Sequence, residues 1–342
     1  MKLSNYSRDF WSMCWALLFF MISFNLIIPE LNDFITDLGG EHQKGLIFLL
    51  FSVSALISRP FSGKLSDTIG RKKVMYIGIV VGLITGALYP FVGFLYGFLF
   101  LRFAHGFSAG FLPTGATAYV TDIIEENGRG VAMGIWGTFI SVGFGVGQFF
   151  AYQITELVGL FGLFMVAVGF CLASGLMIMR MTETLPNPVK FKWSLLKVSW
   201  NDVFEPTVRP AAFVMGCSCV CTGFVFVTTP DISTFLGIEN KGWFFLFYMM
   251  STIIIRLFAS KLSDVIGRRK ALVIGLLFTT TSMLLIGFSQ EWIQYTLGAI
   301  VFGIGTGISS PTVMAWVADL SPVHRRGVGA GTLFIAWSSE SC

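Results

Sequence analysis

Long apolar stretches alternate with short polar stretches along the whole chain. Each apolar stretch is close to the roughly 20 residues that an α-helix needs to cross the hydrocarbon core of a bilayer. An eleventh stretch begins near Gly327. The ten that precede it cover residues 10–29, 45–62, 74–92, 95–121, 130–152, 159–180, 210–229, 242–259, 271–289 and 292–318. The pattern predicts an all-α polytopic membrane protein with about 10 to 11 transmembrane helices.

One segment of the chain occurs twice. Residues 45–74 read GLIFLLFSVSALISRPFSGKLSDTIGRKKV and residues 242–271 read GWFFLFYMMSTIIIRLFASKLSDVIGRRKA, with 15 identities over 30 positions at an offset of 197. The same offset pairs Gly110 with Gly307, Asp122 with Asp319, Arg129 with Arg326, Gly130 with Gly327, Gly134 with Gly331 and Lys44 with Lys241. A repeat this long indicates a duplicated half-protein rather than a solenoid.

The duplication divides the chain into three parts. We predict an N-terminal six-helix half over 1–180, a cytoplasmic linker over 181–209 and an incomplete C-terminal half over 210–342. Within the linker, one helical face would carry Trp193, Leu196, Trp200 and Val203. That face favours a short helix in the inner membrane interface. The alternative is a flexible linker whose tryptophans pack loosely.

The end of the chain interrupts the repeat. At the same offset the second half would end near position 377, whereas the chain stops at Cys342, the equivalent of Gly145. Residues 140–145 read ISVGFG and their counterparts read WSSESC, which is polar where a membrane helix should continue. We predict a truncated or frame-shifted chain of an expected twelve-helix protein. The alternative is a natural ten-helix protein with a short tail.

Composition and charge agree with the membrane prediction. Apolar residues make up 54% of the chain, charged residues only 12%, and the mean hydropathy is +0.76, whereas a soluble domain is about 25% charged. All lysines and arginines except Lys44, Lys241 and Arg102 fall on one side of the predicted spans or at that side's helix ends. The opposite side carries Glu30, Asp33, Asp37, Glu41, Glu156, Asp231, Glu239 and Glu291.

This charge distribution predicts the orientation in a cell (inner) membrane. The positive-inside rule places the N-terminus and the loops 64–73, 181–209 and 260–270 in the cytoplasm. The first span follows a short leader with Lys2 and Arg8 and lacks a small-residue cleavage site. It is therefore predicted to be a retained helix and not a signal peptide.

The most specific pattern is the loop that each repeat carries. Gly63–Lys73 reads GKLSDTIGRKK and Ser260–Lys270 reads SKLSDVIGRRK. Gly63 permits close helix approach, and Gly70 permits a turn with φ > 0. Asp67 is well placed to meet the positive N-terminus of a neighbouring helix or a partner arginine. The alternative, that the bases serve only as a topology anchor, does not explain the repeated Asp and Gly.

This loop in a two-half chain resembles the major facilitator superfamily, whose signature here is Gly-x-Leu-x-Asp-Arg-x-Gly-Arg-Arg/Lys. The matching residues are Gly63, Leu65, Asp67, Gly70, Arg71 and Lys72, then Leu262, Asp264, Gly267, Arg268 and Arg269. Thr68, Val265 and Ser260 depart from it. The resemblance implies a two-bundle fold, with an acid that bridges to the start of helix eleven and holds the inner gate shut. Such a contact is a two-state element for alternating access.

The fourth predicted helix carries charge inside an apolar run, LRFAHGFSAGFLPTG (Leu101–Gly115). An intramembrane charge is costly and marks a functional site by default. Arg102 and Gly106 match an Arg-x-x-x-Gly element of the resembled family, which implies a role in proton coupling or substrate contact. His105 lies one turn away and is able to titrate near neutral pH. The alternatives are a structural pair for Arg102 and an interhelical hydrogen bond for His105.

The fifth predicted helix carries GFGVGQ (Gly143–Gln148), which resembles the glycine-rich element of antiporters but lacks its Gly-Pro pair. Gly143 and Gly147 form a small-xxx-small face, so helix packing explains them. Gln148, and Asn25 in the first helix, are polar candidates for substrate or proton coupling. Each also suits interhelical hydrogen bonding.

Several other functions are excluded by the sequence. It contains no Gly-x-x-x-x-Gly-Lys-Ser/Thr phosphate-binding loop, and no basic-aromatic nucleic-acid patch. Cys217, Cys219 and Cys221 alternate within an apolar helix, so a metal or disulfide role is not expected. We predict no enzyme activity, no catalytic residues, no cofactor, no metal and no nucleic-acid partner.

The combined prediction is a secondary active transporter resembling the drug:proton antiporter branch. It would export small, partly apolar molecules by alternating access, with protons as coupling ion, the lipid bilayer as its surroundings and a monomer as its form. A metabolite carrier of the same fold, for sugars, organic acids or siderophores, is an alternative. A second alternative is a truncated remnant that does not transport.

Overall fold

The structure is a computed structural model that describes residues 6–125, 128–197, 199, 203–238, 243–259 and 261–338. The predictions that concern Trp200, Glu239, Lys241, Ser260 and the last four residues fall outside these ranges, as do the side chains of Asp33 and Asp231. Every regular element in the described part is helical, which agrees with the predicted all-α class.

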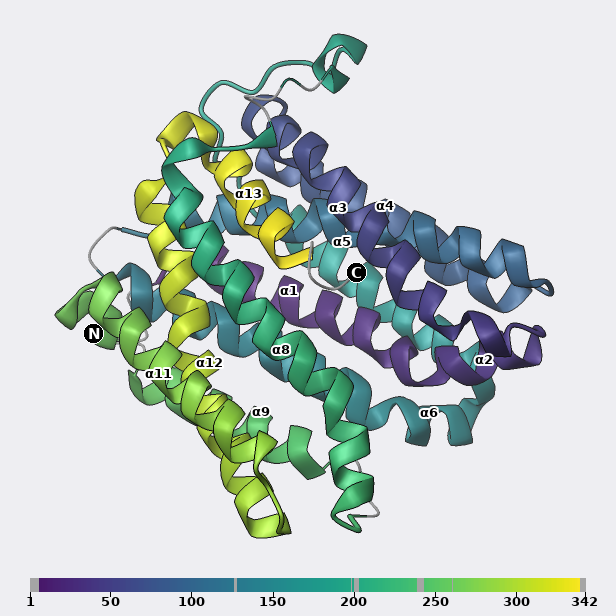
Figure 1. Cartoon of the computed structure of the whole chain (residues 1–342). Helices are drawn as coiled ribbons and strands as arrows, with labels where there is room; N and C mark the ends of the chain where they lie inside the picture. Colours follow the sequence, from purple (N-terminus) through teal and green to yellow (C-terminus); the bar gives the residue numbers. More distant parts are fainter. Residues whose placement is uncertain are drawn as a thin grey trace. The chain divides into compact units, whose positions relative to one another are not determined.

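The elements follow the apolar pattern of the sequence (Figure 1). The long helices are α1 (Arg8–Ile27), α3 (Lys44–Thr68), α4 (Arg71–Leu88), α5 (Leu95–Ile123), α6 (Arg129–Met179), α8 (Arg209–Phe235), α9 (Trp243–Ala259), α11 (Arg268–Gly287), α12 (Trp292–Leu320) and α13 (Arg326–Ser338). Two short helices are α2 (Leu31–Asp37) and α10 (Leu262–Ile266). Within the described residues, 9 helical segments are long and apolar enough to cross a membrane, and Trp243–Arg256 is a shorter apolar one.

Helix α6 contains two of the predicted spans. The chain breaks at Gly159, whose φ of 71° and ψ of 173° lie outside helical values. Glycine reaches positive φ at little steric cost because it has no Cβ. The helix contains two segments long and apolar enough to cross a membrane, Arg129–Ala151 and Gln153–Met179, and the break at Gly159 lies near the start of the second.

The chain folds into two compact units, and each unit is built from segments that are not contiguous in the sequence. Unit 1 comprises Met1–Ile123, Val142–Val208 and Ser321–Cys342; unit 2 comprises Ile124–Ser141 and Arg209–Leu320. Helix α13 thus belongs with the helices of the first sequence half, and the first turns of α6 belong with the second. In unit 1, α3 packs against α5 and α13 and α4 packs against α5; in unit 2, α12 packs against α9 and α11.

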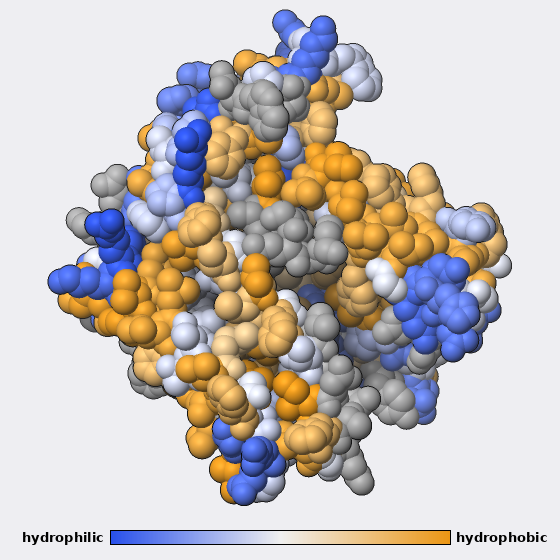
Figure 2. Space-filling view, viewed as in Figure 1, coloured by the Kyte–Doolittle hydropathy of each residue, from blue (hydrophilic) through white to orange (hydrophobic). Residues whose placement is uncertain are grey.

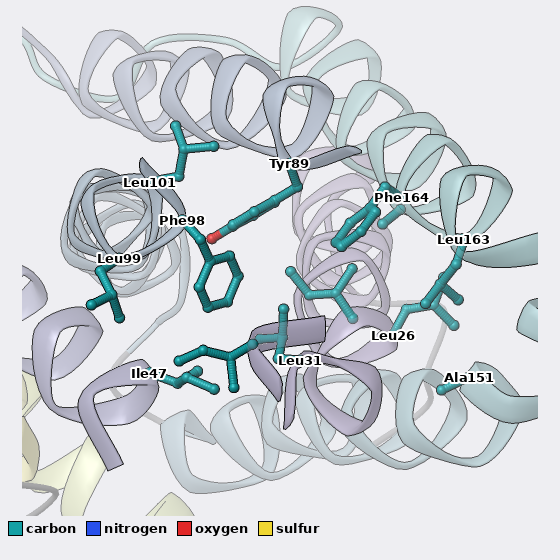
Figure 3. Packing of buried hydrophobic residues seen from close by; sticks show 13 residues of the cluster. Leu26, Leu31, Ile47, Tyr89, Phe98, Leu99, Leu101, Ala151, Leu163 and Phe164 are labelled. Carbon is teal, nitrogen blue, oxygen red and sulfur yellow. The ribbon is translucent and has the colours of Figure 1, made fainter. Parts of the chain in front are cut away.

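An aromatic cluster forms part of the core of unit 1. The Tyr89 ring stacks on Phe164 with centroids 5.3 Å apart and lies 5.8 Å from Phe98, as Figure 3 shows. Leu26, Leu31 and other buried aliphatic side chains complete the cluster. On the face drawn in Figure 2, apolar side chains spread over the flanks of the helices. Such a surface suits a lipid environment.

The linker contains short turns in its described part. Trp193–Leu196 form one 3-10 turn and Pro206–Val208 another. Leu195 and Leu196 pack against Leu65 and Ile69 of the α3–α4 connection, whereas Trp193 is exposed. The predicted interfacial helix includes Trp200, which lies outside the described residues, so that prediction stays untested.

Glycines allow α6 to approach α1 closely. A Cβ on Gly143 would lie 2.7 Å from the Leu18 carbonyl oxygen, and one on Gly147 would lie 2.9 Å from that of Ile22. Both distances are shorter than van der Waals contact. The small-xxx-small face predicted on this helix therefore lies against α1.

Because of this contact, the effect of one added methyl group on the free energy of unfolding should depend on the glycine that receives it. Gly147→Ala is expected to lower the free energy of unfolding by about 1 to 3 kcal/mol, because the backbone of α1 cannot yield as a flexible side chain would. Gly169→Ala, on the same helix with nothing within 4 Å of its Cβ, serves as control. The two melting temperatures in detergent are compared. Equal values would contradict the packing argument.

Candidate functional site

The repeated loop is a tight turn between two helices. Helix α3 ends at Thr68, α4 begins at Arg71, and Gly70 between them has a φ of 123°. Gly267 makes the same turn in the second copy with a φ of 88°. The positive φ expected at Gly70 is confirmed. The turn brings Asp67 and Arg71 together as an ion pair.

Asp67 caps the N-terminus of α13. Its Oδ1 accepts a hydrogen bond from the Gly327 N–H at 2.7 Å and its Oδ2 accepts one from the Val328 N–H at 2.8 Å. The first N–H groups of a helix lack partners in the helix and attract negative charge. Gly63 permits the approach, since a Cβ there would lie 3.0 Å from the Gly327 carbonyl oxygen.

A chain of buried ion pairs extends from this cap. Arg71 donates to Asp67 through Nη1 and to the Asp122 Oδ2 through Nε, the latter at 3.1 Å. Arg326, the first residue of α13, donates to the other oxygen of Asp122 at 2.9 Å. Arg71 is 1% exposed and the Asp67 side chain 7%. Charges this buried persist only when each is paired, so the start of α13 is held at two points.

Unit 2 contains the same arrangement. Asp264 accepts from the Gly130 N–H at 2.9 Å and from the Val131 N–H at 3.1 Å, at the start of α6. Arg268 forms ion pairs with Asp264 at 2.6 Å and with Asp319 at 2.9 Å. Arg129 forms an ion pair with the other carboxylate oxygen of Asp319 at 2.5 Å.

Every member of one network corresponds to a member of the other at the offset of 197. The pairs are Asp67 and Asp264, Arg71 and Arg268, Asp122 and Asp319, Arg326 and Arg129, Gly327 and Gly130, and Val328 and Val131. In each network, the aspartate that caps the helix, its arginine and the second aspartate come from one sequence half. The capped helix comes from the other half. The two halves are therefore connected reciprocally.

Not every residue of the loop motif joins a network. Lys72 instead donates to the carbonyl oxygens of Met179 and Met181, and Arg269 is exposed. Thr68 bonds to its own helix, and Val265 is 79% exposed. Thr68 and Val265, the described positions where this chain departs from the signature, thus lie outside both ion-pair chains.

The sequence prediction of the site omitted several functional groups. Asp122, Asp319, Arg129 and Arg326 were recognised only as repeated positions. Charged residues that recur at the repeat offset were the signal that could have identified them. Glu183 carried no such signal, yet its carboxylate caps α4 by accepting from the N–H groups of Arg71 at 2.9 Å and Lys72 at 3.1 Å.

A second polar cluster is buried in unit 1. The Tyr89 hydroxyl lies 3.2 Å from the Nδ1 of His105, and the Arg102 Nη1 donates to the same hydroxyl at 3.4 Å. The Arg102 Nε donates to the Ile47 carbonyl oxygen at 3.3 Å, and its guanidinium lies 4.9 Å from the Phe51 ring centroid. The hydroxyl thus connects Arg102 to His105, and the imidazole tautomer sets which of Tyr89 and His105 donates.

This cluster exists in one half only. The positions equivalent to Tyr89, Arg102 and His105 are Ile286, Ala299 and Phe302, which belong to an apolar core in unit 2. Sequence reasoning identified Arg102 and His105 but missed Tyr89, because an aromatic residue at a helix end gives no distinguishing signal. Gly106 lies one turn further along α5 against Ser54 of α3.

The remaining polar candidates are separate from this cluster. The Asn25 side chain donates from Nδ2 to the Met21 carbonyl oxygen at 2.8 Å, and its buried Oδ1 has no hydrogen-bond partner within the described part of the chain. Gln148 is half-buried, one residue beyond Gly147. The structure does not join either residue to Arg102 or His105.

Comparisons with known proteins agree on one family. Residues 13–339 match the model described as Major Facilitator Superfamily. The multi-drug resistance efflux pump PmrA of Streptococcus pneumoniae is 27% identical over 318 residues, covering 88% of this chain and 78% of that protein. The human organic anion transporter MFSD10 has a TM-score of 0.84 at 19% identity, covering 98% and 90% of the two chains. The E. coli fucose:proton symporter FucP has a TM-score of 0.79 at 16% identity, covering 97% and 88%.

The two caps predict separable effects on backbone dynamics. Asp67→Asn keeps the size of the side chain but removes its charge, so it should speed hydrogen exchange at the Gly327 and Val328 amides about a hundredfold. Asp264→Asn should do the same at Gly130 and Val131. Exchange is measured by mass spectrometry on the purified protein, and each variant is the control for the other. Unchanged exchange at both helix starts would contradict the capping role.

The buried hydroxyl predicts a stability difference. Tyr89→Phe leaves buried donors and acceptors of Arg102 and His105 without this partner, which costs about 1 to 3 kcal/mol. Tyr76→Phe removes the hydroxyl of a half-buried residue on α4, the helix that precedes Tyr89, and is expected to change the free energy of unfolding by less than about 0.5 kcal/mol. Thermal unfolding in detergent compares the two. A smaller loss for Tyr89→Phe than for Tyr76→Phe would refute the cluster.

Proposed function

The chain belongs to the major facilitator superfamily, and we propose that it is an antiporter that exports small, partly apolar molecules across the inner membrane in exchange for protons. Members of the family are transporters and not enzymes, so the protein carries small molecules across a membrane. The cargo, the direction and the coupling ion are the proposed part.

The duplicated carboxylate cap is the observation that carries the mechanism. We propose that Asp67 and Asp264, with Arg71 and Arg268, hold α13 and α6 at the cytoplasmic ends of the two halves 1–180 and 210–342. When both caps are made, the inner gate is shut. When both are released, the substrate path opens to the cytoplasm, which gives alternating access.

The proposed orientation follows from the charges. The repeated loops carry the bases Lys64, Arg71, Lys72 and Lys73 and their counterparts, so the positive-inside rule assigns them and the N-terminus to the cytoplasm. Substrate would bind near the midplane of the bilayer, in a monomer. A cap that lies on the cytoplasmic side is in the right place to close an inner gate.

The polar cluster of unit 1 is the proposed proton-coupling element. The Nδ1 of His105 is hydrogen-bonded to the Tyr89 hydroxyl, which also accepts from Arg102. A proton bound to the imidazole would add a second positive charge beside this hydroxyl, next to the Arg102 guanidinium. Binding and release of a proton there would change the local electrostatic energy. Asn25 and Gln148 are the proposed polar contacts to substrate.

Export is favoured by the relatives and by composition. PmrA is named as a multi-drug efflux pump, and aromatic residues make up 15% of this chain with 36 Phe. Aromatic side chains bind apolar and cationic molecules of varied shape. A metabolite carrier is the second candidate, because a sugar:proton symporter shares the fold.

The proposal predicts gradient-dependent transport. Vesicles holding the reconstituted 342-residue chain should take up a lipophilic cationic dye when a proton gradient is imposed, and Arg102→Ala should reduce that uptake at least tenfold because intramembrane charge is lost. Lys190→Ala, at an exposed linker position, should leave uptake unchanged.

Three results would overturn parts of the proposal. Dye uptake without gradient dependence would reject proton coupling. Uptake of sugars or organic acids but not of dyes, in a substrate panel, would favour the metabolite carrier. Absence of flux for every substrate would leave the non-transporting alternative.

A further inference from the structure

Two buried arginines take no part in the ion-pair networks. Arg59 on α3 and Arg256 on α9 are 7% and 8% exposed, and they occupy equivalent positions at the offset of 197. A charge among membrane-spanning helices is costly unless it has a partner. Its occurrence at the same place in both halves indicates a role that the duplication retained.

Arg256 contacts the first part of α6, the segment that Asp264 caps. Its Nη1 donates to the Gly137 carbonyl oxygen and, at 2.6 Å, to the Ser141 hydroxyl. Its Nη2 donates to the Ser310 hydroxyl of α12 at 3.3 Å. No described carboxylate pairs with it. The guanidinium is therefore held by neutral oxygens, two of them on α6.

Arg59 contacts α13, the helix that Asp67 caps. Its guanidinium carbon lies over the Phe334 ring, 4.9 Å from the centroid, which is the geometry of a cation–π contact. Phe334 is the equivalent of Gly137, and Pro113 is the equivalent of Ser310. The two equivalent arginines thus contact equivalent positions of α13 and α6. Arg59 does so through a cation–π contact and Arg256 through a hydrogen bond.

The arginine contact lies two turns from the carboxylate cap. Seven residues separate Gly130 from Gly137, and the same number separate Gly327 from Phe334, which is about 10 Å along a helix. Each arginine precedes its aspartate by eight residues. Helix α3, and α9 together with α10, therefore each hold a partner helix at two levels.

We propose that Arg59 and Arg256 form a second, intramembrane contact level of the two gates, positioning α13 and α6 after their N-termini have been capped. The contacts differ in kind: Arg256 donates hydrogen bonds to α6, and Arg59 makes a cation–π contact with Phe334 on α13. The word gate in this proposal rests on the proposed function.

The residue at the contacted position matches each type of contact. A Cβ on Gly137 would lie 3.2 Å from the Arg256 Nη1, so a side chain there would crowd the guanidinium away from the carbonyl oxygen. At position 334 the side chain is itself the partner, and the aromatic face replaces the carbonyl. Gly137 and Phe334 thus provide different contacts, at equivalent positions, for the two equivalent arginines.

The test measures local opening of the two helices without any substrate. In the full chain reconstituted in vesicles, hydrogen exchange is followed over residues 130–141 and 327–335. Arg256→Met should speed exchange in the first segment about tenfold and leave the second unchanged. Arg59→Met should speed only the second, about threefold, as should Phe334→Leu, which keeps apolar bulk but removes the ring face.

Conservative variants distinguish positioning from general stability. Phe334→Tyr keeps an aromatic face and should restore the exchange rate that Phe334→Leu raises. Arg256→Lys keeps the charge but has a single donor group, so it should restore only part of the protection. Equal acceleration in both segments by either Met variant, or none in either, would overturn the proposal. Because no substrate is present, these results do not depend on whether the protein exports drugs.

Discussion

The structure depends on satisfying the buried N-termini of two membrane helices. The first amides of α6 and α13 have no partners within their own helices, and Gly130, Gly327 and Val328 are buried. A carboxylate supplies two acceptors and a negative charge at the positive end of the helix dipole. Asp67 and Asp264 do this with four N–H···O bonds between 2.7 and 3.1 Å. The paired arginines balance the negative charge of those carboxylates.

The caps also explain how the compact units are composed. Because Asp67 holds the start of α13, that helix packs with the first sequence half, and because Asp264 holds the start of α6, the first turns of α6 pack with the second. Each capped helix begins at an interaction that can be broken and remade as a unit. A conformational change that releases one carboxylate frees a whole helix start rather than a single side chain.

The two units share this cap arrangement but differ in their interiors. Unit 1 contains the Arg102–Tyr89–His105 cluster, whereas unit 2 has Ala299, Ile286 and Phe302 at those positions. A symmetric pair of caps combined with an asymmetric polar interior agrees with the proposed carrier, in which both halves move and one half binds the coupling ion. The contacts of Arg59 and Arg256 differ in kind, which adds a second asymmetry.

The sequence alone determined the helical membrane fold, the duplication and the motif loops, because hydrophobic length, the 197-residue offset and the glycines of each turn are local properties. It also identified Asp67 from the repeated loop, and Arg102 and His105 because each departs from its apolar surroundings. Only the tertiary structure showed that Asp122 and Arg326 meet, that Tyr89 links Arg102 to His105, and that Arg59 reaches Phe334. Those partners lie between 13 and 275 residues apart along the chain. Their proximity results from helix packing, which no local pattern encodes.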